Sequence, residues 1–185
     1  MKKDSVQIRV VTEADAPKLL EIYAPYVQKT IVTYEYEVPT EEEFRGRIRN
    51  TLKRYPYFAA EKDGEILGYA YASAMNTRAA ADWSAEATVY LREDAKGKGI
   101  GRMLYTALED ALKEQHVIRL YAKIADPNPD SVAFHEAVGY QFAGKFTDCG
   151  YKLGQWIGLI LMEKQIGVYT NPPQGFIPYM QKEKG

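Results

Sequence analysis

The chain has 185 residues, 46% hydrophobic and 26% charged, with a formal net charge of −1, which suits one globular domain with a full hydrophobic core. So balanced a charge gives no general attraction to a nucleic-acid backbone, and no apolar segment approaches the roughly 20 residues that cross a bilayer. With a single cysteine, Cys149, and no signal-like apolar segment at its start, the chain is expected to be cytoplasmic and to bind neither nucleic acid nor membrane.

The first 40 residues predict a strand, a helix and a loop. Alternating apolar residues predict a strand over 6–10, and the Thr-x-x-Asp spacing that follows is typical of the N-cap of a helix over 12–23. The helical pattern loosens from Pro25 onward, and the polar and aromatic run 30–36 indicates a loop.

The next segment predicts a second helix and a hairpin. Residues 41–54 begin with a capping pattern and acids in the first turn, where the helix dipole favours them. Strands are predicted over 57–61 and 66–73, joined by an Asp-Gly pair that accepts positive φ. The small and polar residues 76–82 indicate a loop.

The stretch 86–101 combines a strand with a glycine-rich entry into a helix. Thr-Val-Tyr-Leu fits a half-buried strand, and from Ile100 apolar residues recur at three- and four-residue steps, which predicts a helix. The sequence Lys96-Gly-Lys-Gly-Ile-Gly101 therefore lies over the first helical turn, whose N–H groups lack intrahelical partners and carry the positive end of the dipole. A pyrophosphate group would fit there.

Three interpretations of these glycines are open on spacing alone. They form a tight connection that needs unusual φ and ψ values, a dinucleotide-binding turn, or another phosphate-binding loop. A Rossmann fingerprint needs G-x-G-x-x-G with an acid about 20 positions later, whereas this chain has G-x-G-x-G, and Asp126 comes too late. A Walker A loop is excluded because no Lys-Ser or Lys-Thr follows a glycine here.

The rest of the chain continues the α/β pattern. A strand over 117–124 follows the central helix, and this order implies a parallel pair with a right-handed crossover. A short helix capped by Ser131 or Asp130 is expected to end at Gly139.

Two more strands are predicted, over 141–146 and 155–162, and no periodicity follows Gly167. We expect one domain over 1–166 and a tail over 167–185 that packs on the body or on a neighbouring subunit.

The motif Lys96-x-x-Gly99-x-Gly101 resembles the acyl-CoA pyrophosphate motif Q/R-x-x-G-x-G/A of the GNAT acetyltransferases. Lys96 keeps the cation of that pattern but not its planar geometry. Further segments, in the same order, resemble the phosphinothricin and methionine-sulfone N-acetyltransferases, and the similarity runs from about residue 8 to 163. These segments are 82–90, 104–108, 128–131 and 135–140.

This resemblance implies an α/β (α+β) fold, the GNAT fold, with a mixed central sheet of six to seven strands. Helices flank the sheet, and its two central parallel strands splay apart. It also implies acetyl-CoA as cosubstrate, no metal and a homodimer. The implied acceptor is the α-amine of phosphinothricin, methionine sulfone, methionine sulfoximine or a related amino acid.

Glu86 is the candidate general base. It is an acid at the start of an otherwise apolar strand, where burial would make its carboxylate a stronger base. From the residues alone, a solvent-facing acid at a strand end is an equal alternative. In the resembling enzymes, the glutamate of this Glu-x-Thr-Val-Tyr pattern is the base.

The resemblance also implies the residues that bind the cosubstrate. Main-chain groups of the central strand would hold the pantetheine arm and thioester carbonyl, the glycine loop the pyrophosphate, and Asn128 the arm. On local grounds Asn128 is equally an Asn-Pro turn, Ser131 a helix cap and His135 a structural residue. The candidate set is Val89, Tyr90, Leu91, Lys96, Gly97, Lys98, Gly99, Ile100, Gly101, Asn128, Ser131 and His135.

For the acceptor, Arg78 is placed to hold a carboxylate through its two-pronged guanidinium, although a solvated loop arginine is nearly as plausible. Thr33, Tyr34 and Tyr36 would line the other side. Cys149 has no obvious paired base and is expected to be a buried or neutral structural thiol rather than a nucleophile.

Three other functions remain open at this stage. They are acetylation of a protein or peptide N-terminus, which needs an open groove, a non-catalytic acyl-CoA-binding module, and a Rossmann oxidoreductase.

Overall fold

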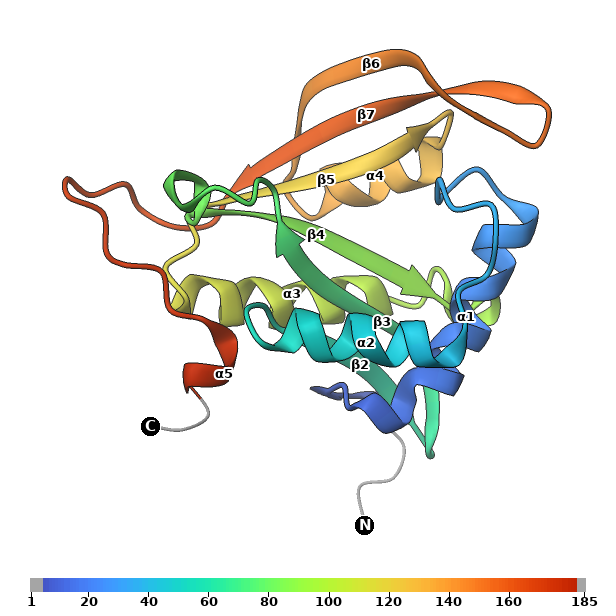
Figure 1. Cartoon of the computed structure of the whole chain (residues 1–185), viewed down its shortest axis with the longest axis horizontal. Helices are drawn as coiled ribbons and strands as arrows, with labels where there is room; N and C mark the ends of the chain where they lie inside the picture. The colour runs from blue at the N-terminus through green and yellow to red at the C-terminus, as the bar shows by residue number, and fades with distance from the viewer. Residues whose placement is uncertain (1–4, 183–185) are drawn as a thin grey trace.

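The computed structural model describes residues 5–182. The ends of the predicted domain and tail, residues 1–4 and 183–185, lie outside the described residues. Seven strands form one sheet in the order β1-β2-β3-β4-β5-β7-β6 (Figure 1). The strands are β1 (Gln7–Val10), β2 (Tyr57–Lys62), β3 (Glu65–Ala74), β4 (Ser84–Leu91), β5 (Arg119–Asp126), β6 (Gln141–Lys152) and β7 (Gln155–Gln165). The helices are α1 (Ala16–Lys29), α2 (Glu41–Leu52), α3 (Ile100–Glu114), α4 (Pro129–Ala137) and α5 (Tyr179–Lys182).

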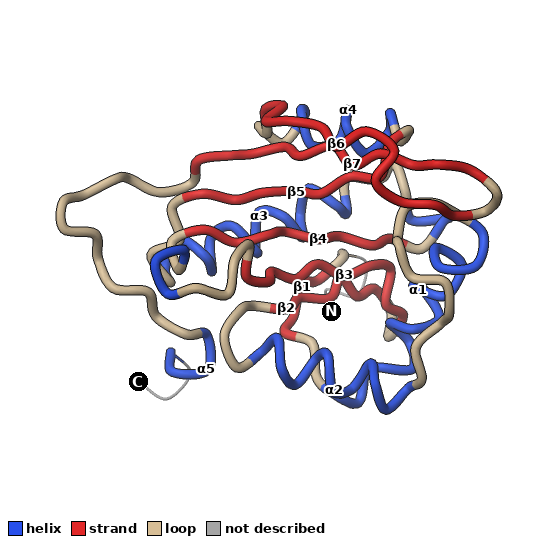
Figure 2. Tube along the Cα trace, turned by 45° about the horizontal axis from the view of Figure 1, so that its top comes forward, coloured by secondary structure: helices blue, strands red, loops and turns tan. Residues whose placement is uncertain are grey.

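Helices cover both faces of the sheet (Figure 2). On one face, buried apolar side chains of α1 and α2 pack against those of β2 and β3. On the other face, α3 places Leu104, Leu108 and Leu112 in a core that also holds alanines of β3, β4 and β5. The small side chains on the sheet allow the helix to approach closely, and the large ones come from the helix.

The only parallel pair among the described strands joins β4 and β5, and it is short. Residues 84–86 of β4 pair with residues 119–121 of β5, and beyond them each strand continues beside its other neighbour. In Figure 1 the two strands start together and fan apart toward their carboxyl ends. The predicted mixed sheet with splayed central strands is therefore confirmed, and beyond the splay the facing edges of β4 and β5 have no strand partner in each other.

Several predicted boundaries were wrong. Helix α1 continues through Pro25 to Lys29, because Tyr23 and Val27 on either side are buried and hold it in place. Strand β6 extends beyond the predicted end at 146 to residue 152. Its extension pairs with β7 around a two-residue turn at Leu153 and Gly154, both with positive φ. The extension is mostly exposed, so it lacks the alternation by which strands are predicted.

The predicted hairpin between β2 and β3 is confirmed at Asp63 and Gly64, which have φ values of 52° and 81°. The N-cap of α4 is Asn128, not Ser131 or Asp130. The Asn128 side-chain oxygen accepts a hydrogen bond of 3.2 Å from the Ser131 N–H.

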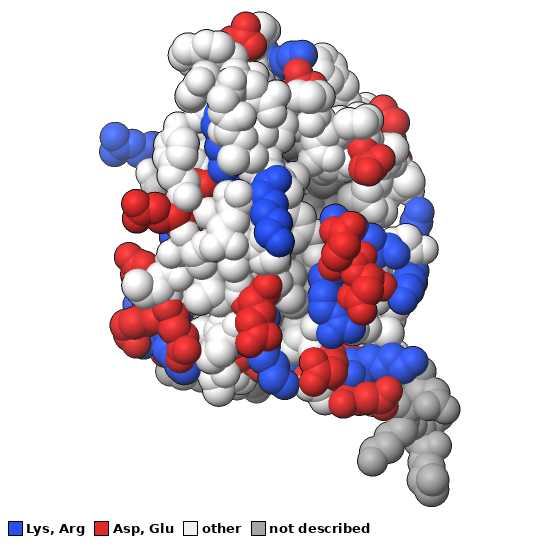
Figure 3. Space-filling model, turned by 90° about the vertical axis from the view of Figure 1, so that its right-hand side faces the viewer, with Lys and Arg blue, Asp and Glu red and all other residues white. Residues whose placement is uncertain are grey.

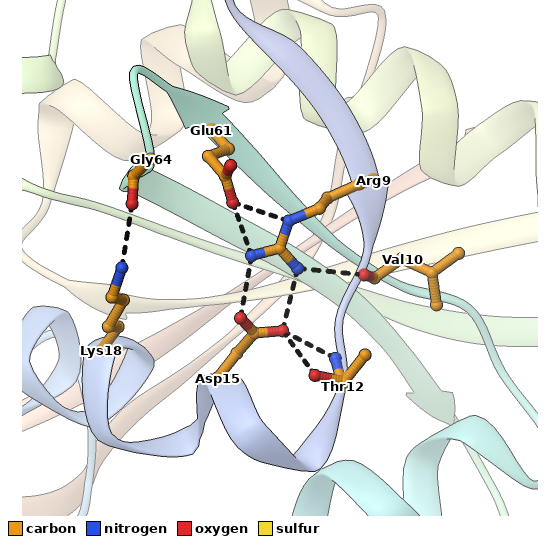
Figure 4. A network of polar contacts seen from close by, with 7 residues as sticks. All are labelled: Arg9, Val10, Thr12, Asp15, Lys18, Glu61 and Gly64. Atoms are coloured by element: carbon orange, nitrogen blue, oxygen red, sulfur yellow. Dashed lines mark hydrogen bonds and ion pairs between the residues drawn. The ribbon is translucent and has the colours of Figure 1, made fainter.

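Arg9 ties the start of the chain to the sheet (Figure 4). From β1 its guanidinium donates to both Asp15 carboxylate oxygens, at 2.9 and 2.8 Å, and to Glu61 of β2 at 2.7 Å. The Asp15 carboxylate also accepts the Thr12 N–H at 2.8 Å. These contacts fix the turn from β1 into α1, and the bidentate geometry makes the Arg9–Asp15 pair a strong one.

The segment after β7 returns along the body of the same chain. The buried Gln115 at the end of α3 donates to the carbonyl oxygens of Arg54 and Ile177, both at 2.7 Å. The Arg54 guanidinium lies 4.4 Å from the ring centre of Phe176. Among the described residues, none of the helices has the length and apolar character needed to cross a membrane.

Leu104→Ala tests the packing of α3 under the sheet. Leu104 is 0% exposed, so removing its side-chain carbons leaves a cavity and should lower the free energy of unfolding by about 2–5 kcal/mol. Its neighbour Met103 is 40% exposed, and Met103→Ala should change the value by no more than about 0.5 kcal/mol. Urea unfolding of both variants measures the difference, and equal losses would contradict this packing.

Candidate active site

The glycine loop gives the start of α3 its shape. Gly97 and Gly99 have φ values of 71° and 78°, a region that other residues rarely adopt, and Gly99 is the N-cap of the helix that begins at Ile100. A Cβ atom added at either glycine would meet nothing within 4 Å. The loop therefore needs glycine for its backbone conformation, and the space above it is open to a ligand.

The two loop lysines differ in their surroundings. Both are exposed, but the Lys96 ammonium lies 2.5 Å from a Glu93 carboxylate oxygen and 5.2 Å from the ring centre of Tyr26, whereas Lys98 lies near the Asp94 carboxylate. Figure 3 shows Lys and Arg interspersed with Asp and Glu over the neighbouring end of the molecule. A phosphate group at this loop would thus depend mainly on the backbone N–H groups at the start of α3.

A cleft lies where β4 and β5 part. It is lined by residues of both strands, by Val32 from the loop before α2, and by residues of α3 and α4. The structure thus brings together five of the predicted cosubstrate residues, which are Val89, Tyr90, Asn128, Ser131 and His135. The remaining lining residues are Ala87, Thr88, Tyr105, Ala122, Lys123, Ile124 and Ala125.

His135 and Tyr105 form a buried pair on one wall of this cleft. The His135 Nδ1 atom lies 2.7 Å from the Ser131 carbonyl oxygen and therefore donates its hydrogen there. The Nε2 atom is left to accept from the Tyr105 hydroxyl at 3.0 Å. The imidazole is only 4% exposed, and burial lowers its pKa, while burial raises the pKa of Tyr105 well above its usual range. Both groups are thus neutral near pH 7.

Glu86 points to the opposite face of β4 from Ala85 and Ala87 of the α3 core. Its carboxylate is 20% exposed and lies 2.7 Å from the ammonium of Lys123, which is 37% exposed. The predicted apolar surroundings were wrong, because a cation from β5 partners this acid. The ion pair requires Glu86 as a carboxylate, the form that can accept a proton.

The loop before α2 lies against the β6–β7 hairpin. The Tyr34 hydroxyl donates to the Gly158 carbonyl oxygen at 2.8 Å, and the Tyr36 hydroxyl donates to that of Tyr151. Thr33 is buried, with its hydroxyl 2.7 Å from that of Tyr23. These contacts place the loop over the cleft to which it contributes Val32.

Two predicted features lie elsewhere. Arg78 is exposed in the loop between β3 and β4, where its N–H donates to Asn76 at 2.9 Å, and the cleft-lining residues come from other segments. Cys149 is exposed on β6 rather than buried, with its sulfur 3.6 Å from the Tyr34 hydroxyl. Between residues 5 and 182, no group of three or more His, Cys, Asp or Glu is placed to hold a metal ion.

A family profile described as "Acetyltransferase (GNAT) domain" matches residues 8–161, most of the chain. The chain belongs to the GNAT acetyltransferases. It is therefore a GNAT N-acetyltransferase. Its glycine loop and its splayed central strands are the features that the resemblance to this family predicted.

Three relatives of this GNAT chain illustrate the similarity. A phosphinothricin N-acetyltransferase from Alcaligenes faecalis is 35% identical over 161 residues, covering 86% of this chain and 82% of its own. The crystal structure of a GNAT superfamily phosphinothricin acetyltransferase from Sinorhizobium meliloti in complex with AcCoA is 32% identical. It matches with a TM-score of 0.88 over 94% of this chain and 96% of its own. A ribosomal-protein-alanine N-acetyltransferase from Brucella melitensis is also 32% identical, with a TM-score of 0.83 over 86% and 99%.

Sequence reasoning missed the partner of Glu86. Lys123 occupies a position in β5 between buried residues, and a lysine within an apolar strand is the signal that marks it. Its distance from Glu86 depends on the parallel register of β4 and β5, whose paired residues, for example 84 and 119, are 35 positions apart in the chain, and no local pattern reports that register. The contact of Tyr105 with His135 was also missed, because it needs the packing of α3 on α4.

The buried His135 should make stability depend on pH. Its pKa in the folded protein lies below the ordinary 6.5, so on acidification the unfolded chain binds a proton that the folded chain does not. Its contribution is present above pH 6.5 and is lost as the pH falls toward the folded value. The free energy of unfolding should therefore fall between about pH 7.5 and about pH 5.5, and fall less in His135→Gln. Equal slopes in urea titrations of the two proteins would contradict a neutral, buried imidazole.

Proposed function

We propose that this GNAT enzyme transfers the acetyl group of acetyl-CoA to the α-amine of a small amino-acid-like substrate, with Glu86 as general base. The observation that carries the proposal is the position of Glu86. Glu86 is the last β4 residue that pairs with β5 before the two strands separate, and its ion-pair partner Lys123 lines the cleft between them. A base is therefore available at the point where an amine and a thioester would meet.

The cleft suggests how the cosubstrate is held. The backbone N–H groups of residues 97–101 would bind the pyrophosphate, with Lys96 and Lys98 beside them. The Val89 main-chain groups and the Leu91 N–H, on the edge of β4 that lacks a strand partner there, would bind the pantetheine arm and the thioester carbonyl, with Tyr90 between them. The Leu91 carbonyl oxygen accepts a hydrogen bond from the Tyr26 hydroxyl. Asn128, Ser131 and His135 line the opposite wall.

The reaction requires no covalent enzyme intermediate. The acceptor ammonium gives one proton to the Glu86 carboxylate, and the freed amine attacks the thioester carbonyl carbon as the new C–N bond forms. The C–S bond then breaks, and the second proton lost by the nitrogen passes to the departing thiolate. The products are the N-acetyl amino acid and the free thiol of CoA, and protonated Glu86 releases its proton to solvent.

For the acceptor, we propose phosphinothricin, methionine sulfone, methionine sulfoximine or a related amino acid. The similarity to the phosphinothricin acetyltransferases over most of both chains supports this class. Thr33, Tyr34 and Tyr36 come from the loop over the cleft, and Arg78 is the proposed ligand of a substrate carboxylate.

Two alternatives stand beside this proposal. The similarity to a ribosomal-protein-alanine N-acetyltransferase favours acetylation of a protein N-terminus, since an N-terminal residue offers the same α-amine. A non-catalytic acyl-CoA-binding module would use the cleft but not Glu86. Acetyl-CoA incubated with free amino acids or short peptides, with CoA thiol release followed, separates the three. If none of the amines tested causes release of CoA thiol, the enzymatic proposal is contradicted.

We further propose that residues 1–166 form the catalytic domain and 167–185 a tail on its surface, and that the protein is a cytoplasmic homodimer. The exposed Cys149 suits a reducing compartment. The β6–β7 hairpin supports the dimer because β6 is an edge strand and the hairpin exposes large apolar side chains. These side chains are Phe142, Phe146, Tyr151, Leu153 and Trp156.

Light scattering after gel filtration tests the dimer. The expected mass is twice the chain mass of 21.0 kDa, and Phe146→Ser should shift the population toward the monomer by removing apolar area from the contact. A wild-type mass equal to one chain would contradict it.

Glu86→Gln tests the base. The amide keeps the shape of the side chain but does not accept the proton, so kcat should fall about 10²- to 10⁴-fold. The KM for acetyl-CoA should stay the same, because Glu86 lies outside the glycine loop. Steady-state thiol release measures both constants, and a normal kcat would remove Glu86 from the mechanism.

A further inference from the structure

Lys123 is the cation closest to the proposed base. Its ammonium lies 2.7 Å from the Glu86 carboxylate, and the residue lines the cleft between β4 and β5. It comes two positions after Tyr121, the last β5 residue that pairs with β4, and so lies on the same sheet face where the strands have begun to separate. The ion pair thus spans the opening of the cleft.

Other cations of β5 and β6 have other partners. Lys145 lies 2.5 Å from Asp126, Arg119 lies 2.8 Å from Glu163, and the buried Lys152 donates to the Thr33 carbonyl oxygen at 2.7 Å. Only in the Lys123 pair is the carboxylate partner the proposed base itself. An amine that reaches Glu86 must therefore displace this ammonium or share the carboxylate with it.

An α-amino acid is suited to make that exchange. Its amine nitrogen and carboxylate carbon are separated by only about 2.5 Å, the distance across two backbone bonds. With the ammonium group on Glu86, the carboxylate falls within reach of a flexible lysine whose ammonium began 2.7 Å from the same acid. The zwitterion then replaces one ion pair by two, so the half-buried Glu86 carboxylate and the Lys123 ammonium each keep a partner of opposite charge.

We propose that Lys123 binds the α-carboxylate of the acceptor and so selects free amino acids over amines that lack this group. The proposal rests on the proposed function, with Glu86 receiving the amine. Arg78, exposed in its loop, would be a second and outer ligand. A peptide N-terminus carries a neutral amide in place of the carboxylate, so it would leave Lys123 unpaired. The ion pair therefore disfavours protein N-termini as substrates.

The test compares L-methionine sulfone with its α-carboxamide as acceptors for wild type, Lys123→Met and Lys123→Arg. The wild type should prefer the free acid. Because a hydrogen bond between charged groups is lost, Lys123→Met should lower kcat/KM for the acid about 10- to 100-fold, chiefly through KM. Its kcat/KM for the carboxamide should change less than about threefold, and Lys123→Arg should retain the preference for the acid. Lys145→Met is the matched control for loss of a paired lysine, and it should behave as wild type.

Three results would overturn the proposal. If Lys123→Met lowers kcat/KM equally for the acid and the carboxamide, the lysine only positions Glu86. If it lowers kcat/KM for neither, the lysine has neither role. A wild-type preference for the carboxamide would be the reverse of the proposed selectivity. If wild type releases thiol with neither compound, the proposed function fails for this acceptor. Calorimetry of L-methionine sulfone binding then tests whether Lys123 binds the α-carboxylate. Equal affinity for wild type and Lys123→Met would contradict that role.

Discussion

The separation of β4 from β5 is the constraint on which the rest of the site depends. Each strand is paired along its outer side, β4 with β3 from Ala85 to Leu91 and β5 with β7, so the sheet stays continuous while its centre opens. The parallel register holds for three residue pairs and ends at Glu86. The opening exposes backbone donors and acceptors along the cleft between β4 and β5. Helix α3 begins near the end of this cleft, and the N–H groups of its first turn have no intrahelical partner.

The two walls of the opening differ in chemistry. Toward α3 and α4, the buried pair of Tyr105 and His135 is neutral, and each polar atom of that contact has a partner. On the other face, the half-buried Glu86 forms an ion pair with the more exposed Lys123. A long uncharged thioester arm suits the first surroundings and a zwitterionic acceptor the second, so the splay divides the cleft between two substrates. Positioning of this kind supplies much of the acceleration in direct transfer.

Local sequence patterns predicted the elements because each depends on neighbouring residues. The glycine loop could be placed because Gly97 and Gly99 adopt positive φ, and the Asp63-Gly64 turn because it needs the same conformation. The extension of β6 was missed because both of its faces are largely exposed, which removes the alternation. Glu86 was chosen through a family resemblance, but its partner Lys123 followed from neither periodicity nor motif, since only the register of β4 on β5 brings them together. Arg78 carried the right chemistry, but the structure places it in an exposed loop.

A crystal structure of this protein with acetyl-CoA tests the central claim most directly. The account predicts the pyrophosphate on the backbone N–H groups of residues 97–101, the pantetheine arm between β4 and β5, and the thioester carbon on the Glu86 side of the splay. Acetyl-CoA bound outside this cleft, or with its thioester directed away from Glu86, would contradict the account.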